Sequence, residues 1–471
     1  MKENWQEQLH TLLNCDLKEL YPLARSLNRK LEFYVGPTNS GKTYNAMQKL
    51  KKANSGLYLA PLRLLALEGY ESLKKDDIEA SLITGEEQML NEDAAHVCST
   101  IEMIDYDLDV DVCVIDEVQM LDDIDRGWAW VNAIIGCPAK KVIMTGSVNA
   151  LEAIKKIATY LGEDLEVVRH KRKTELKVNE KYTSLDNLED GTALIAFSRA
   201  DVLKLRHRLK KNYTVSVIYG NLSPEVRRDE ARKFRENKSQ ILIATDAIAM
   251  GLNLPIKTIL FTTDTKFDGV SRRKITVNEI VQIAGRAGRY GHFEAGFLGA
   301  TRRDILKHIS EEYKQPIKTI KPPFRVKINA QQLESLSSHI KTTSLTKILK
   351  FFAENMSFSG PFIAANISSM ITASKIVDTR FSMKLEDKYL LAQAPITTRS
   401  PIILQAYEAY IAAVVKQKVC PYKPSITLPK KVITQKDLLL VEDEVKKISL
   451  YLWLSYKLPE IFPDHDKAYG L

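Results

Sequence analysis

Residues 36–43 read Gly36-Pro37-Thr38-Asn39-Ser40-Gly41-Lys42-Thr43, which fits the pattern G-x-x-x-x-G-K-[ST] of a phosphate-binding loop. Successive backbone N–H groups in such a glycine-rich turn form a concave nest for phosphate oxygens, and the following helix points its positive end at the same anion. The Lys42 ammonium suits the β- and γ-phosphates, and the Thr43 hydroxyl suits Mg²⁺. The pattern therefore predicts ATP or another nucleoside triphosphate, together with Mg²⁺, as ligands.

The flanks of this loop have the character that the motif requires. Residues 31–35 are apolar except for Glu32 and are expected to form a strand, and residues 44–52 are expected to form a helix. Short apolar strands then alternate with helical patterns, and the alternation restarts after the basic stretch 170–173. Such alternation is typical of parallel sheets, so the expected fold class is α/β with two domains in tandem. The further expected strands are 57–59, 81–83, 96–98, 112–115 and 142–145 in the first domain, and 192–196, 215–218, 240–244, 257–261 and 296–298 in the second.

These patterns divide the chain into four expected parts. Residues 1–30 form an amphipathic helical extension whose helix is broken at Pro22, and the two α/β domains cover residues 31–165 and 166–320. Strand signals fade after Pro323, and residues 321–471 are expected to be mainly helical, with helices at 344–355, 385–394, 401–416 and 438–458. Tyr407, Tyr410, Trp453 and Tyr456 recur at helical spacing and are expected in the core of this region.

The composition excludes several classes of protein. No apolar run of the 471 residues reaches the roughly 18–20 residues that cross a bilayer, so no membrane association is expected. The five cysteines are scattered without a C-x-x-C pair, which indicates neither a zinc site nor a disulfide framework. The first residues lack an apolar segment and include acidic residues, which favours a bacterial cytoplasm. A mitochondrial matrix is the alternative if a transit peptide has been removed.

Charge is unevenly distributed along the chain. Residues 1–165 carry a net charge of −10, residues 166–320 carry +11, and residues 321–471 carry +8. An acidic first domain followed by two basic regions suggests that a polyanion is held mainly by the latter two. The alternative is that these lysines and arginines form an ordinary solvated surface.

Two further segments carry residues suited to triphosphate hydrolysis. Residues 112–115 are hydrophobic and are followed directly by Asp116-Glu117. Asp116 is therefore placed to hold Mg²⁺, and Glu117 is placed to orient the attacking water. In the second domain, residues 282–289 read Gln282-Ile283-Ala284-Gly285-Arg286-Ala287-Gly288-Arg289, and the two guanidinium groups suit developing charge on a phosphoryl group. Because these groups lie in different domains, hydrolysis is expected only when the domains close.

Two strand-to-loop segments fit the same scheme. Thr145-Gly146-Ser147 follows a strand of the first domain and is a candidate link between the nucleotide site and a bound strand. Residues 244–253 follow a strand of the second domain, where Gly251 is a candidate contact to the nucleotide. Each segment is also compatible with an ordinary strand-to-helix loop.

Several stretches together resemble a known family. GPTNSGKT, LAPLRLLALE, CSTIEM, VIDEVQM, TGS, ALIAFSRAD, ATDAIAMGLN and QIAGRAGRYG are similar to the motifs of superfamily 2 helicases. DEVQM, in place of DEAD or DEAH, and the segment leading into QIAGRAGR resemble more narrowly the mitochondrial degradosome RNA helicase family and its bacterial relatives. The resemblance is dense over residues 33–300 and loose over the last 150 residues.

The resemblance implies two RecA-like domains that use ATP to unwind RNA and to move 3′→5′ along a single strand, in RNA turnover. It implies that Lys42, Thr43, Asp116 and Glu117 form the ATP and Mg²⁺ site, completed by Gln282, Arg286 and Arg289. Residues 262–278 match a strand-separating hairpin, which is short here. Nucleic-acid contacts are implied at Pro61, Arg63, Thr84, Gly85, Ser99 and Thr100 in the first domain, and at Ser198, Arg199, Thr245 and Asp246 in the second.

The motifs leave two other functions open. A DNA helicase would grip phosphates in the same way, since the 2′-hydroxyl is what distinguishes RNA. A nucleic-acid-binding scaffold that recruits a ribonuclease would use ATP only to change shape. The expected partners are single-stranded or tailed duplex RNA, with a ribonuclease as a further candidate.

Overall fold

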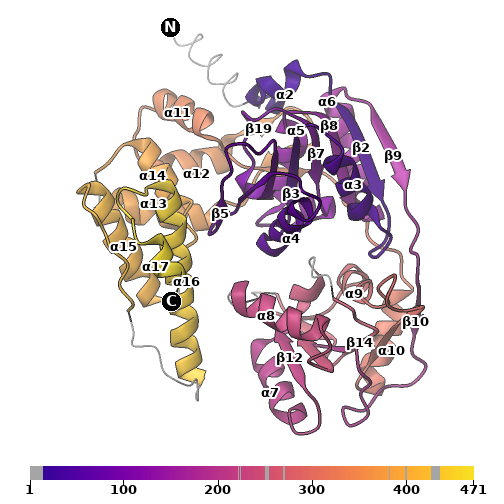
Figure 1. The fold of residues 1–471 in the computed structure, drawn as a ribbon. Coiled ribbons are helices and arrows are strands. Elements are labelled where there is room, and N and C mark those ends of the chain that lie inside the picture. The colour runs from indigo at the N-terminus through magenta and orange to yellow at the C-terminus, as the bar shows by residue number, and fades with distance from the viewer. Residues whose placement is uncertain are drawn as a thin grey trace.

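The computed structural model describes residues 14–470 apart from 221, 223, 250–253, 269–270, 381, 398–399 and 426–434. The two expected sheets are both present, one in each of two lobes, and a mainly helical region lies beside both lobes (Figure 1). Apart from one antiparallel pair in the first sheet, both sheets are parallel, as the alternating pattern predicted.

The first sheet has eight strands in the order β5-β4-β6-β3-β7-β8-β2-β9. Side chains alternate between its faces, so Phe33 packs with α5 and α6 while Tyr34 packs with α3 and α4. The strands are β2 Lys30–Val35, β3 Gly56–Ala60, β4 Ala80–Ile83, β5 Gln88–Met89, β6 His96–Thr100, β7 Val110–Ile115, β8 Ala139–Gly146 and β9 Leu165–Arg169. The helices are α3 Lys42–Lys51, α4 Arg63–Lys74, α5 Gly127–Gly136 and α6 Leu151–Leu161.

The second sheet has six parallel strands in the order β10-β17-β14-β11-β13-β12. Apolar side chains of α8, α9 and α10 pack on one face, and those of α7 pack on the other. The strands are β10 Glu175–Val178, β11 Thr192–Ile195, β12 Val215–Ile218, β13 Ile241–Ala244, β14 Thr258–Phe261 and β17 Ala295–Ala300. The helices are α7 Arg199–Leu209, α8 Pro224–Arg235, α9 Val277–Ala284 and α10 Arg303–Tyr313.

A short hairpin projects from the second sheet between β14 and α9. Its strands β15 Thr265–Phe267 and β16 Arg272–Lys274 pair antiparallel, and Lys266 lies opposite Arg273. The hairpin falls within residues 262–278, where the resemblance placed one.

The helical region comprises α11 Ala330–His339, α12 Leu345–Asn355, α13 Ser368–Arg380, α14 Leu385–Ala392, α15 Pro401–Val415, α16 Gln435–Lys457 and α17 His465–Tyr469. It also contains the short strands β18 Phe324–Val326, β19 Ser357–Phe358 and β20 Phe362–Ala364, which the sequence did not predict. No described helix is long and apolar enough to cross a membrane.

The N-terminal segment differs from the expected helix. Residues 1–13 lie outside the described residues, and Asn14–Cys15 form strand β1, which pairs with β19. A 3₁₀ turn over Leu17–Leu20 follows, and the short helix α2 Pro22–Ser26 begins at the proline that was expected to break a helix. Proline is favourable in the first turn because the backbone N–H it lacks has no partner there.

Candidate active site

The phosphate loop has the predicted strand before it and the predicted helix after it. β2 ends at Val35 and α3 begins at Lys42, after Gly41, whose φ of +83° is readily adopted by glycine. A side chain at Gly36 has no room, since a Cβ there would lie 2.5 Å from the His170 carbonyl oxygen. The Lys42 ammonium donates to the Pro37 carbonyl at 3.0 Å across the loop. The loop thus has the glycine-dependent strand–turn–helix geometry of a phosphate-binding site.

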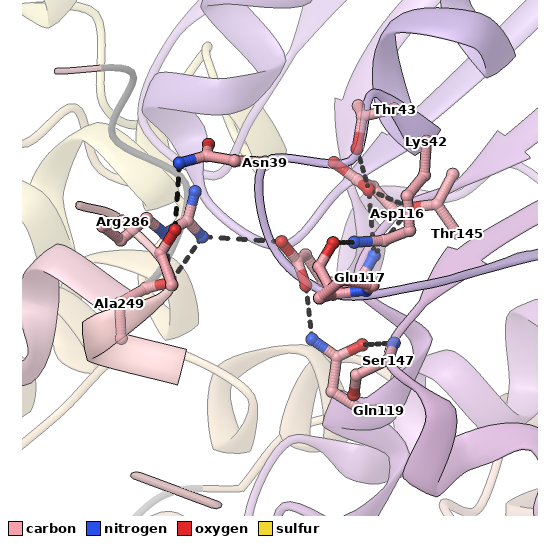
Figure 2. Close-up of polar contacts among 12 residues, drawn as sticks. Asn39, Lys42, Thr43, Asp116, Glu117, Gln119, Thr145, Ser147, Ala249 and Arg286 are labelled. Atoms are coloured by element: carbon pink, nitrogen blue, oxygen red, sulfur yellow. Dashed lines mark hydrogen bonds and ion pairs between the residues drawn. The ribbon is translucent and has the colours of Figure 1, made fainter. Parts of the chain in front are cut away.

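Asp116 lies buried at the end of β7, beside this loop. The Thr43 hydroxyl donates to Oδ1 at 3.0 Å, and the Thr145 hydroxyl also donates to Oδ1 (Figure 2). The Tyr58 hydroxyl donates to Oδ2 at 3.1 Å. Burial and the neighbouring Glu117 raise the pKa of Asp116, against these hydrogen bonds. The three hydroxyl groups therefore fix the position of the carboxylate, and its ionised form would be stabilised further by a nearby cation.

These groups suit Mg²⁺. The Thr43 hydroxyl and the Asp116 carboxylate are oxygen donors held side by side, and a divalent cation would offset the cost of ionising Asp116 next to Glu117. The described residues contain no group of three or more acidic, histidine or cysteine ligands. That is compatible with Mg²⁺, which commonly takes one or two protein ligands and completes its shell with water and phosphate oxygens.

Glu117 has an unusual backbone and two side-chain partners. Its φ of +54° places it in the left-handed region, which a residue without glycine's freedom adopts only when its surroundings hold it there. The Gln119 amide donates to its carboxylate, and Gln119 Oε1 accepts from the Ser147 N–H at 3.1 Å. Gln119 thus connects Glu117 to the loop after β8. The DEVQM motif contains this glutamine, but the motif did not show which groups it would contact.

Arg286 of the second lobe reaches Glu117 of the first. Its Nη2 lies 3.5 Å from Glu117 Oε1, and its Nε donates to the Ala249 carbonyl at 3.0 Å (Figure 2). A cavity of about 130 Å³ opens between the lobes, and both Gln282 and Arg286 line it. From the first lobe it is lined by Gly36, Pro37, Thr38, Lys42, Pro61, Glu117, Gln119, Met120, Ser147, Val148 and Asn149.

Several of the predicted nucleotide-site residues are not among the described residues that line this cavity. Asn39, Ser40, Gly41 and Thr43 belong to the phosphate loop itself, and Asp116 is joined to that loop by the Thr43 hydroxyl. Arg289 is not among its described lining residues; burial and nearby Arg235 lower its pKa while Glu68 of α4 raises it, so it lies beside that acidic group. Gly288, with φ +67°, lies between Arg286 and Arg289. Gly251 lies outside the described residues.

The predicted nucleic-acid residues of the first lobe gather at one edge of its sheet. They lie at the end of β6 and just after β4 and β3, neighbouring strands whose carboxyl ends meet there because the strands are parallel. Arg63 forms an ion pair with Glu86, and the Thr84 hydroxyl accepts from the Glu87 N–H at 2.9 Å. Pro61 also lines the cavity, so this edge adjoins the phosphate loop. The residues at the edge are Pro61, Arg63, Thr84, Gly85, Ser99 and Thr100.

The second lobe places its predicted contacts in the same way, after the adjacent strands β11 and β13. Ser198 caps α7 by accepting from the Asp201 N–H at 3.1 Å, and Arg199 forms an ion pair with Glu442 of α16. Thr245 follows β13 directly, and Asp246 accepts from Lys266 of the hairpin at 2.6 Å.

Known proteins match both lobes and the C-terminus. Residues 18–170 match the DEXQ-box helicase domain of Suv3, residues 176–291 match the helicase conserved C-terminal domain, and residues 438–471 match the ATP-dependent RNA helicase SUV3 C-terminal domain.

Relatives match over nearly the whole chain. ATP-dependent RNA helicase SUV3, mitochondrial, of Candida albicans is 34% identical over 96% of this chain and 67% of its own length. DExH-box ATP-dependent RNA helicase DExH16, mitochondrial, of Arabidopsis thaliana is 34% identical over 95% and 80%. ATP-dependent RNA helicase SUPV3L1, mitochondrial, of Homo sapiens is 32% identical over 97% and 62%. Among solved structures, S. cerevisiae Dbp5 bound to RNA and ADP BeF3 aligns with 71% of this chain and 94% of its own, at 15% identity and a TM-score of 0.46.

Proposed function

The chain belongs to the SUV3 family of ATP-dependent RNA helicases, and from this premise we propose that it hydrolyses ATP between its lobes, moves 3′→5′ along single-stranded RNA and unwinds duplexes. The observation that carries the proposal is the approach of Arg286 to Glu117 across the cavity that the phosphate loop lines.

In the proposed reaction each lobe supplies a different part of the site. The phosphate loop and Lys42 bind the triphosphate, and Glu117 orients and polarises the attacking water. Arg286 places positive charge where the phosphoryl group develops negative charge, and Gln282 lies beside it in the cavity. Thr43 and Asp116 would hold Mg²⁺, which when bound neutralises charge on the phosphate oxygens. Hydrolysis then requires a closed cleft, because Glu117 and Arg286 belong to different lobes.

The same closure would move RNA. The residues after β3, β4 and β6 would grip the backbone on the first lobe, and those after β11 and β13 would grip it on the second. Contacts to phosphate and sugar position a protein without reading sequence, so such grips tolerate any strand. Closing on ATP shortens the distance between the grips, and release after hydrolysis lets one of them advance.

The relatives' names also bear on the cellular compartment of the protein. Those cited above are named mitochondrial RNA helicases, which supports the mitochondrial alternative over the bacterial cytoplasm that the first residues suggested. We place the chain in RNA turnover, with a ribonuclease as a candidate partner, on the family resemblance alone.

The central test compares ATP hydrolysis with RNA, with a DNA oligonucleotide of the same sequence and with neither. We expect RNA to stimulate the wild-type rate more than DNA does. Lys42→Ala should abolish ATP hydrolysis, because the ammonium that binds the triphosphate is removed. Lys52→Ala, which changes an exposed lysine just after the same helix, should keep the wild-type rate. Equal stimulation by DNA would favour a DNA helicase, and Lys42→Ala with wild-type turnover would overturn the site.

Strand separation needs its own assay. We expect a duplex with a 3′ single-stranded tail to be unwound when ATP is added and a duplex with a 5′ tail to be left intact. A scaffold would bind both duplexes and separate neither, and unwinding of the 5′-tailed duplex alone would reverse the proposed direction.

A further inference from the structure

The connection between the two sheets carries an arginine that touches both lobes. Residues 170–174 run from β9, an edge strand of the first sheet, to β10, an edge strand of the second. Arg172 in this connection donates from Nη1 to the Gly285 carbonyl at 3.0 Å and to the Thr38 carbonyl at 3.4 Å. Its Nη2 donates to the Ala287 carbonyl, and its Nε donates to the Thr174 carbonyl at 2.8 Å.

In the described part of the chain, every acceptor of this guanidinium is a backbone carbonyl. Guanidinium groups in proteins more often pair with carboxylates or phosphates, yet among the described residues none of the ion pairs involves Arg172. The carbonyls come from three places: the phosphate loop, the connection itself, and the turn that precedes and follows Arg286. One planar group with several donors in fixed directions therefore sets the spacing of three backbone segments.

The junction around Arg172 is closely packed. The Asn39 side-chain amide donates to the Gly285 carbonyl at 2.9 Å, so a second residue of the phosphate loop holds the same acceptor. A Cβ at Gly285 would lie 2.7 Å from the Thr38 Cβ, which shows that the loop and the turn are in direct contact. The Thr174 hydroxyl donates to the Gly288 carbonyl on the other side. A change of spacing here would therefore displace Arg286, which is one residue from Gly285.

We propose that Arg172 is a positioning residue for ATP hydrolysis: it fixes the turn Gly285–Ala287 against the phosphate loop and so brings Arg286 to Glu117. This proposal rests on the proposed ATPase function. Arg172 is not among the described residues that line the cavity, so it acts through Arg286 rather than on the nucleotide. Its loss should lower turnover, while ATP affinity, which the phosphate loop and Lys42 supply, should change little.

The test is a double-variant cycle on the full chain, with ATP hydrolysis measured at saturating RNA. Arg172→Ala should lower kcat about 10- to 100-fold, because a small displacement of a charge-stabilising group has an effect of this size. The KM for ATP should stay within about twofold of wild type. Arg286→Ala should lower kcat at least as much, and the double variant should be no slower than Arg286→Ala alone, because the two residues act as one unit. Lys171→Ala, an exposed neighbour with the same charge change, should match wild type.

A conservative variant separates positioning from charge. Arg172→Lys keeps the positive charge but cannot donate to several carbonyls in fixed directions, so kcat should stay low. If Arg172→Ala does not fold by circular dichroism, the cycle is run with Arg172→Lys under the same criteria. Wild-type kcat in either variant, or losses that multiply in the double variant, would overturn the proposal. Failure of the proposed function is distinct, since the wild type itself would then show no RNA-stimulated hydrolysis.

Discussion

Two adjacent carboxylates, Asp116 and Glu117, have different surroundings at the residue scale. Asp116 is buried and accepts from three hydroxyl groups, so its position is fixed by the first lobe alone. Glu117 turns into the left-handed region and points toward Arg286 of the second lobe. One peptide unit thus separates a carboxylate suited to hold a cation from one suited to sense closure of the lobes.

Lys327, just after β18, gives a prediction about pH. Its ammonium lies 4.5 Å from the ring centroid of Trp128, and burial lowers its pKa to about 8, against the attraction of Glu102. The ordinary pKa of an unfolded lysine is about 10.4, so between about pH 8 and pH 10.4 the unfolded chain binds more protons than the folded one. The unfolding free energy should therefore rise with pH between about pH 8 and pH 10.4. Below about pH 8 the folded protein carries the full cost of burying the charged ammonium of Lys327.

The measurement compares urea unfolding of wild type and Lys327→Met at pH 7 and pH 10. The difference in unfolding free energy should move in favour of wild type by about 2 kcal/mol over this range. Lys350→Met, which changes an exposed lysine of α12, should show a difference from wild type that does not vary with pH. A pH-independent difference for Lys327→Met as well would contradict the expected titration.

At the element scale, the sequence predicted the strands whose side chains are buried on both faces. Residues 215–218 form β12 with the predicted bounds, and the other predicted strands differ by a few residues at their ends. β9 and β10 were missed because each is an edge strand of only four or five residues, two of them charged, and lacks the continuous apolar run by which the other strands were predicted. β18, β19 and β20 are only two or three residues long, and they form through tertiary pairing rather than local preference.

The candidate site was predictable in part for a similar reason. The loop 36–43, Asp116, Glu117 and Arg286 have motifs that can be read locally, and the structure brings them together. Arg172 lay in a basic run, and its partners are backbone carbonyls, which have no signature in a sequence. The absence of Arg289 from the described cavity lining depends on tertiary packing, which the motif alone does not specify.

Helix α16 joins the helical region to both lobes. The Tyr456 hydroxyl accepts from the Gln88 N–H at 3.0 Å in the first lobe, and Trp453 packs within 3.7 Å of where a Cβ would stand on Gly85. Both aromatics were expected in the core of the helical region, where Tyr407 and Tyr410 are indeed buried. Trp453 and Tyr456 are only partly buried, and both lie against the first lobe instead of wholly inside the helical region.

The same helix gives a prediction for RNA binding. Glu442 of α16 pairs with Arg199, whose predicted role is to contact the RNA backbone, and the side chains are 6% and 19% exposed. RNA must displace this carboxylate to reach the guanidinium, so the pair opposes binding. Glu442→Gln should therefore tighten binding of a labelled single-stranded RNA by about three- to tenfold, or about 1 kcal/mol, as measured by fluorescence anisotropy.

Two controls make this prediction specific. Glu408→Gln breaks a more exposed ion pair, with Arg380 inside the helical region, and should leave RNA affinity unchanged. Adding Arg199→Gln to Glu442→Gln should remove the gain, because the freed cation is then absent. Unchanged or weaker RNA binding by Glu442→Gln would show that the carboxylate does not compete with RNA.

At the scale of the whole molecule, each parallel sheet collects its loops at one edge. The phosphate loop follows β2, the other predicted contacts follow β3, β4 and β6, and those of the second lobe follow β11 and β13. α16 lies alongside both lobes (Figure 1). Nucleotide and RNA residues are thus carried by the same rigid sheets, so a movement of one lobe against the other changes both sites together.

The distribution of charge over these parts sets the last prediction. The acidic first lobe carries the nucleotide loop, while residues 166–320 and 321–471 carry +11 and +8. RNA binding that neutralises about three to five phosphates releases counterions, so the logarithm of affinity should fall with the logarithm of salt concentration at a slope of about −2 to −4 for a single strand. Anisotropy measured between about 50 and 300 mM KCl would give this slope.

Lys42→Ala should share the wild-type slope because that lysine faces the nucleotide, whereas Arg199→Gln should make it shallower by about 0.7. A slope near zero in the wild type would mean that the basic regions do not hold the RNA backbone.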